Sequence, residues 1–115
     1  MDIPADEQPA HVLMAIRQWP RPAELAEFAA KKMGFGDDNG GFGVTYPDEM
    51  DDDARHIPKG FVETYGFWGS PDGYEFLVSE RTYLQLLAHH LKVLGLTAES
   101  VSVERLADQT AEPPT

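Results

Sequence analysis

Residues 61–94, FVETYGFWGSPDGYEFLVSERTYLQLLAHHLKVL, decide the fold class of this chain. Two β-prone runs, 61–68 and 74–79, flank the turn sequence GSPDG, whose Pro and Asp-Gly take standard turn roles. Ser79 is then placed to cap a helix over about 80–94, in which apolar residues recur at helical spacing until Gly95 ends it. An antiparallel hairpin followed by an amphipathic helix predicts an α+β fold.

The N-terminal half adds a second predicted helix and a short strand. Pro22 suits a first helical position, and the apolar spacing that follows predicts a helix that Gly34 ends. FGVTYP, residues 42–47, is typical of a strand, and the composition of 34–41 is that of a loop. Together with the hairpin, these elements predict a small, mainly antiparallel sheet packed against two helices.

Two further segments are expected to be strands. Residues 11–19 are ambiguous between a short helix and a strand, and their length together with the Trp19-Pro20 stop favours a strand. Residues 101–106, VSVERL, are expected to form a last short strand.

The 115 residues are expected to form one domain. We expect a flexible N-terminal arm over 1–10, a single α+β domain over 11–106 with an acidic loop region over 36–56, and a flexible tail over 107–115. The chain has no cysteine, which excludes a disulfide scaffold, a Cys-ligated zinc site and thiol catalysis. Its N-terminus lacks a signal-peptide pattern, and no apolar run approaches the length of a transmembrane helix.

The charge is strongly unbalanced. With 20 acidic and 9 basic side chains, the formal net charge is −11. Such a surface repels phosphate backbones and anionic lipids, which disfavours nucleic-acid and membrane partners and favours basic ones. Seven acidic residues and no basic one lie between Phe35 and Ala54. They are Asp37, Asp38, Asp48, Glu49, Asp51, Asp52 and Asp53. This excess is larger than solubility needs, so we predict that it meets a basic protein surface.

The sequence assigns no catalytic, cofactor-binding or metal-ligating residue, and no cofactor is expected. The glycine-rich segment 34–43 contains no Lys or Arg to hold a phosphate, and its acidic residues do not follow the calcium-loop pattern. His89 and His90 point about 100° apart on a helix and cannot share a metal ion, which predicts one boundary and one exposed side chain. His56, after the acidic run, is either part of a pH-sensitive loop or an ordinary surface residue.

Apolar side chains near the hairpin have competing interpretations. The aromatic residues that bracket the turn are expected to be mostly core, with Trp68 as the best candidate for an exposed partner contact. Glu63 and Glu75 lie on opposing strands, where a solvated face is expected. A leucine stripe on the second helix is expected to be core first and a homodimer seam second. Its members are Leu84, Leu87, Leu91 and Leu94.

In size, charge, lack of cysteine and the hairpin-plus-helix block 65–91, the chain resembles small acidic immunity proteins of bacterial polymorphic toxin systems. The resemblance implies a cytoplasmic, non-enzymatic protein that neutralises a cognate toxin, such as a nuclease. We expect the seven acidic residues and Trp68 to form the contacts. Two alternatives stay open: a small enzyme or ligand-binding domain with a pocket between sheet and helices, and a homodimeric housekeeping protein.

Overall fold

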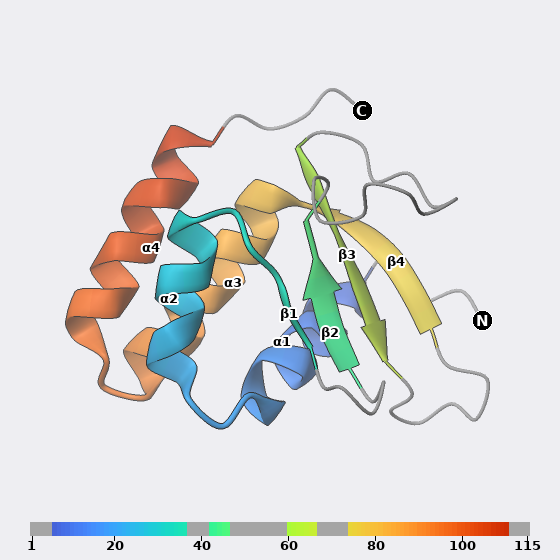
Figure 1. The fold of residues 1–115 in the computed structure, drawn as a ribbon, viewed down its shortest axis with the longest axis horizontal. Helices are drawn as coiled ribbons and strands as arrows, with labels where there is room; N and C mark the ends of the chain where they lie inside the picture. The colour runs from blue at the N-terminus through green and yellow to red at the C-terminus, as the bar shows by residue number, and fades with distance from the viewer. Residues whose placement is uncertain (1–5, 37–41, 47–59, 67–73, 111–115) are drawn as a thin grey trace.

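Helices cover one face of a four-stranded antiparallel sheet in the computed structural model (Figure 1), which describes residues 6–36, 42–46, 60–66 and 74–110. The elements in chain order are α1 (Gln8–Gln18), α2 (Pro22–Ala30), β1 (Phe35–Gly36), β2 (Phe42–Thr45), β3 (Phe61–Gly66), β4 (Tyr74–Ser79), α3 (Glu80–Val93) and α4 (Thr97–Gln109). The predicted α+β fold with a small antiparallel sheet is therefore confirmed. The described residues form four helices, however, where two were predicted.

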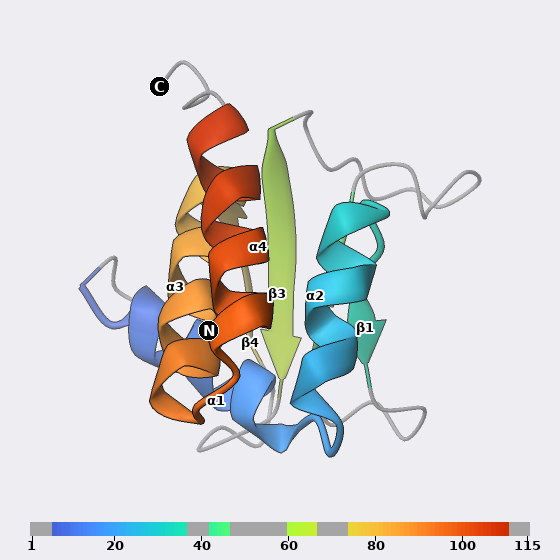
Figure 2. The same cartoon turned by 90° about the vertical axis from the view of Figure 1, so that its left-hand side faces the viewer.

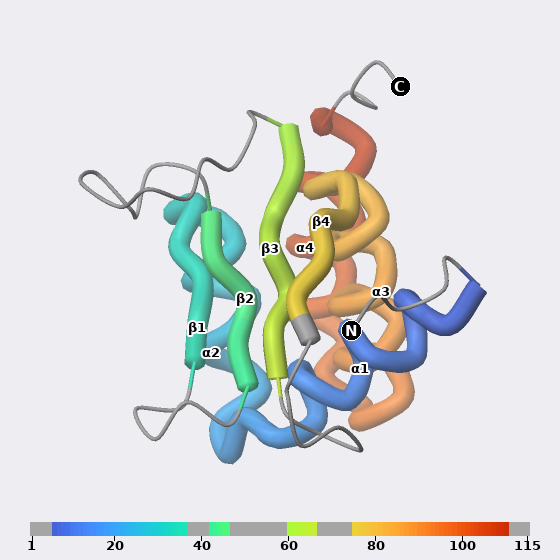
Figure 3. The backbone as a smooth tube through the Cα atoms, turned by 90° about the vertical axis from the view of Figure 1, so that its right-hand side faces the viewer, coloured from blue at the N-terminus to red at the C-terminus, as the bar shows by residue number. Residues whose placement is uncertain are grey.

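The strands follow one another across the sheet in the order β1-β2-β3-β4, each antiparallel to its neighbour. The predicted hairpin is confirmed, with Val62 paired to Val78 and Tyr65 paired to Glu75. Because side chains alternate along a strand, Val62 and Val78 point toward the helices, whereas Tyr65 and Glu75 point away from them. Figure 3 looks onto the sheet from the side opposite the helices, and Figure 2 looks from the helical side.

The C-terminal helices form the most closely packed pair of elements. Ser79 is the N-cap of α3, as predicted, because its Oγ accepts a hydrogen bond from the backbone N–H of Thr82 at 3.0 Å. The apolar stripe of α3 then packs against α4, and the Ser100 hydroxyl of α4 donates to the carbonyl of Ala88 at 2.8 Å. The core between the two layers consists of fully buried side chains from both, such as Ile16 and Val44.

Two segments predicted as strands are helices. Residues 11–18 lie in α1, and Trp19 is its C-cap. The buried residues Val12, Ala15 and Ile16 recur at helical spacing and pack against β2, β3 and α3. Residues 101–106 lie in α4, where the spacing of Ser100, Val103 and Ala107 places one face against α3. In both cases burial of a helical face outweighs a local sequence preference for strand.

Several predicted boundaries also shift. α1 begins at Gln8, inside the predicted arm, and α4 continues to Gln109, inside the predicted tail. α2 ends at Ala30, four residues before the glycine predicted to end it, because Lys32 adopts a left-handed conformation with φ of 59°. The segment 34–41, predicted as a loop, contains β1.

Candidate functional site

The predicted partner contacts lie on the segments that join the strands. All eight fall outside the described residues: Asp37, Asp38, Asp48, Glu49, Asp51, Asp52, Asp53 and Trp68. Their points of attachment are nevertheless fixed by the strand register. β1 ends and β2 begins beside the end of β3, because Gly36 pairs with Gly43 and Phe42 pairs with Gly66. The segments 37–41 and 67–73 therefore attach at one end of the sheet, and 47–59 attaches at the other.

Basic side chains are unevenly distributed over the described part of the fold. The helices and their ends carry all seven basic side chains of the described residues: Arg17, Arg21, Lys31, Lys32, Arg81, Lys92 and Arg105. The only charged residues in the strands are Glu63 and Glu75. Along the whole sequence, residues 35–79, which include every strand, hold ten of the 20 acidic residues but only two of the nine basic ones. Most of the net negative charge thus belongs to the sheet half of the chain.

One face of the sheet carries no helix among the described residues (Figure 3). The register assigns its side-chain positions, which we call the helix-free face: Gly36, Gly43, Thr45, Phe61, Glu63, Tyr65, Glu75, Leu77 and Ser79. Glu75 is exposed, and Leu77 retains 41% of its accessible surface. Phe61 and Tyr65 are half-buried. This face therefore combines aromatic, apolar and acidic groups and has no described basic group.

The two glutamates of the helix-free face differ in environment. Glu63 pairs with Leu77 and is only 8% exposed, so the prediction that it lies on a solvated face is wrong for this residue. Glu75 pairs with Tyr65 and is exposed, as predicted. The two carboxylates are therefore diagonal neighbours on adjacent strands rather than directly opposed, which reduces their mutual repulsion.

Tyr65 leans across the sheet over two glycines. A Cβ atom added at Gly43 would lie 2.2 Å from the Tyr65 hydroxyl oxygen, and one added at Gly36 would lie 2.4 Å from the same oxygen. The glycines of β1 and β2 therefore make room for the hydroxyl end of the ring. The aromatic residue closest to the exposed carboxylate thus lies along the sheet rather than in the core, where the sequence placed most of the aromatic cluster. Phe76 packs against the core, and Phe67 and Trp68 lie outside the described residues.

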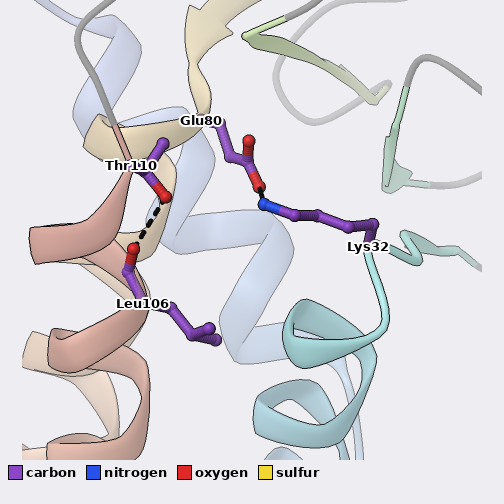
Figure 4. Close-up of polar contacts among 4 residues, drawn as sticks. All are labelled: Lys32, Glu80, Leu106 and Thr110. Carbon is purple, nitrogen blue, oxygen red and sulfur yellow. Dashed lines mark hydrogen bonds and ion pairs between the residues drawn. The ribbon is translucent and has the colours of Figure 1, made fainter.

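An ion pair connects the end of α2 to the start of α3. Lys32, just after α2, reaches Glu80 at the start of α3, with Nζ 2.5 Å from the carboxylate (Figure 4). The Glu80 side chain is 12% exposed and that of Lys32 is 57% exposed. The backbone N–H of Glu80 also donates to the carbonyl of Gly60 at 2.8 Å. Glu80 therefore links α2, α3 and the beginning of β3, which indicates a structural role.

The histidines of α3 behave as predicted. His89 is exposed and His90 is half-buried. Burial lowers the pKa of His90, and the nearby charges of Arg17 and His89 lower it further. Within the described parts of the chain, no three His, Asp or Glu side chains converge to hold a metal ion.

A shallow groove of about 250 Å³ lies at the outer side of β4. Gln8, Pro9, Leu77, Val78, Ser79, Thr82 and Leu86 line it. None of these lining residues is ionisable, so the groove offers no acid or base for catalysis. The space between sheet and helices, where a pocket was considered, is occupied by buried core side chains of the described residues.

The leucine stripe is core, the first of its two predicted roles. Leu84, Leu87 and Leu91 are almost completely buried within this chain. Leu94 alone of the four is on the surface, at 49% exposure. Three of the four residues proposed for a homodimer seam are therefore already covered by the chain's own α4 and core.

No helix within the described residues is both long and apolar enough to cross a membrane. Comparison with known proteins finds no match to any family model, curated protein or solved structure.

Proposed function

We propose that this chain is a non-enzymatic, acidic, cytoplasmic binding protein that neutralises a basic protein partner. A cognate bacterial toxin, such as a nuclease, is the partner that the resemblance to immunity proteins suggests. The observation that supports the proposal best is the uneven distribution of charge along the chain. The described basic side chains belong to the helices, while the strands and the segments joining them carry a large acidic excess.

A region of the chain with a large acidic excess suits rapid capture of a basic protein. Complementary potentials steer the encounter and raise the association rate constant, and they disfavour acidic competitors. An inhibitor of a nuclease gains a further advantage, because its carboxylates can occupy the groove that the enzyme uses for phosphates. Self-repulsion among the acidic residues is the cost of this arrangement, and a bound basic partner would relieve it.

The test begins with co-purification from the source cells at low salt, followed by binding measurements with the purified partner. We expect the association rate constant to fall steeply as salt rises, because screening shortens the range of the attraction. Reversing Asp51, Asp52 and Asp53 to Lys should weaken binding. The matched control reverses three exposed acids of the helices, Glu27, Glu104 and Asp108.

The control separates local from overall charge, because both triple variants change the net charge equally. The proposal fails if no basic protein is retained. It also fails if the reversals at 51–53 leave the association rate constant unchanged, or if the helical control lowers it by the same factor.

A further inference from the structure

The helix-free face contains a pair of groups suited to one cationic side chain. Tyr65 on β3 and Glu75 on β4 are directly opposed in the register, so their side chains emerge side by side on the same face. Glu75 is exposed, and Tyr65 is half-buried with its hydroxyl end lying over Gly43. An exposed carboxylate is thus the direct cross-strand neighbour of a tyrosine whose ring extends along the sheet over β2.

The surroundings of this pair favour a positive ligand. Glu75 is the exposed carboxylate of the helix-free face, whereas Glu63 on the same face is buried. The basic side chains of the described residues are all in the helical layer. A cation is attracted both by a carboxylate and by the face of an aromatic ring within about 6 Å. Exposed Leu77, the next residue on this face of β4, adds apolar surface for the stem of a long side chain.

We propose that the helix-free face is the docking surface for the basic partner, and that Tyr65 and Glu75 together receive an Arg or Lys side chain of that partner. This inference rests on the proposed function and assigns it a place on the fold. A second copy of this chain is a poor occupant, because each copy has a net charge of −11 and presents the exposed carboxylate of Glu75 on the same face.

A nona-arginine peptide is the probe. Titrated into the full-length, ¹⁵N-labelled protein at low salt, it should shift the backbone amide signals of Tyr65, Glu75 and Leu77, and each signal gives a dissociation constant for its own location. We expect Glu75→Gln to weaken binding at this location about 2- to 5-fold, the effect of losing one exposed ion pair. Tyr65→Leu should weaken it by a similar factor, because the ring face is lost.

Glu104→Gln is the matched control, since it removes one exposed acid from α4 and leaves the sheet unchanged. It should alter the dissociation constant at β4 less than 2-fold. Glu75 is on the surface, so Glu75→Gln still tests the inference if Tyr65→Leu disturbs the packing over Gly36 and Gly43 and fails to fold.

Two results would overturn the inference. The first is a peptide that binds but shifts only signals of the helices or of residues 47–59, which rejects the docking surface and leaves the proposed function standing. The second is an equal loss from Glu75→Gln and Glu104→Gln, which reduces the effect to overall charge. The proposed function is judged separately, by the purified partner and the reversals at 51–53.

Discussion

The close approach of Tyr65 to Gly36 and Gly43 allows a quantitative test of how the sheet is packed. A Cβ atom at Gly43 would lie 2.2 Å from the Tyr65 hydroxyl oxygen, 2.4 Å from Cζ of the ring and 2.7 Å from the Phe35 carbonyl oxygen. At Gly36 the one severe contact is with the hydroxyl oxygen, at 2.4 Å, since Cζ is 3.6 Å away. A side-chain hydroxyl can move aside, but a strand carbonyl cannot move without distorting the β1–β2 pairing.

We therefore expect Gly43→Ala to lower the free energy of unfolding by about 2–3 kcal/mol, in the upper part of the range for overpacking. Gly36→Ala should cost about 1 kcal/mol or less, partly offset by the reduced entropy of the unfolded chain. In a Tyr65→Phe background the hydroxyl oxygen is absent. Gly36→Ala should then be nearly neutral, while Gly43→Ala should remain destabilising because Cζ and the Phe35 carbonyl are still in place.

Urea unfolding followed by far-ultraviolet circular dichroism measures these differences. With a typical slope of about 1–3 kcal/mol per molar urea, Gly43→Ala should lower the midpoint by roughly 0.7–3 M at an unchanged slope. The reasoning is refuted if Gly43→Ala lies within about 0.5 kcal/mol of the parent, which is the size of an ordinary surface substitution. It is also refuted if Tyr65→Phe rescues both alanine variants fully, because the contact with the Phe35 carbonyl would then carry no cost.

Three further predictions concern the helical layer. Ser79→Ala removes the N-cap of α3 and should cost about 1 kcal/mol in urea unfolding, whereas the same change at exposed Ser102 should cost little. Leu87→Ala should cost about 2–5 kcal/mol because the side chain is fully buried, while Leu94→Ala should change stability by less than about 0.5 kcal/mol in the same assay. The lowered pKa of His90 means that the unfolded chain binds a proton more readily, so stability should fall as pH drops below about 6.5 and level off below the folded-state pKa. His90→Asn should flatten that part of the pH profile of the free energy of unfolding, and an unchanged profile would show that another group causes it.

The hairpin and α3 were predictable because strong local signals agree with the tertiary structure. Pro and Asp-Gly mark the turn, Ser79 supplies the cap, and the leucine spacing defines a helical face that is buried. Each signal has one dominant physical interpretation, and the long-range packing favours the same structure.

α1 and α4 lack local sequence signals of this strength. The apolar run at 11–19 is short, and Trp19-Pro20 ends a helix as readily as a strand. Pro9, in the first turn of α1, was the available signal, since proline is tolerated there and rarely inside a helix. In α4 the β-branched Val101 and Val103 favoured a strand. The face of α4 that packs against α3 contains buried Val103, whereas Val101 is exposed. The spacing of Ser100, Val103 and Ala107 was the signal that should have outweighed them.

The candidate surface was only partly accessible from the sequence. The acidic excess between Phe35 and Ala54 is a property of the sequence and needs no structure. That Tyr65 and Glu75 are opposed follows from the register, which a turn sequence alone does not fix. The role of Gly36 and Gly43 depends on the ring of Tyr65, which reaches them from β3. No local sequence pattern predicts that contact.

The ion pair between Lys32 and Glu80 has a consequence for the folding kinetics. It joins positions 48 residues apart, and every strand of the sheet lies between them. Closing so long a loop directly costs more chain entropy than closing any one of the three strand pairings, each of which joins neighbours in the sequence. The α2–α3 connection is therefore expected to form after the folding transition state. A contact formed that late changes the unfolding rate and leaves the folding rate nearly unaffected, so we expect this pair to slow unfolding without hastening folding.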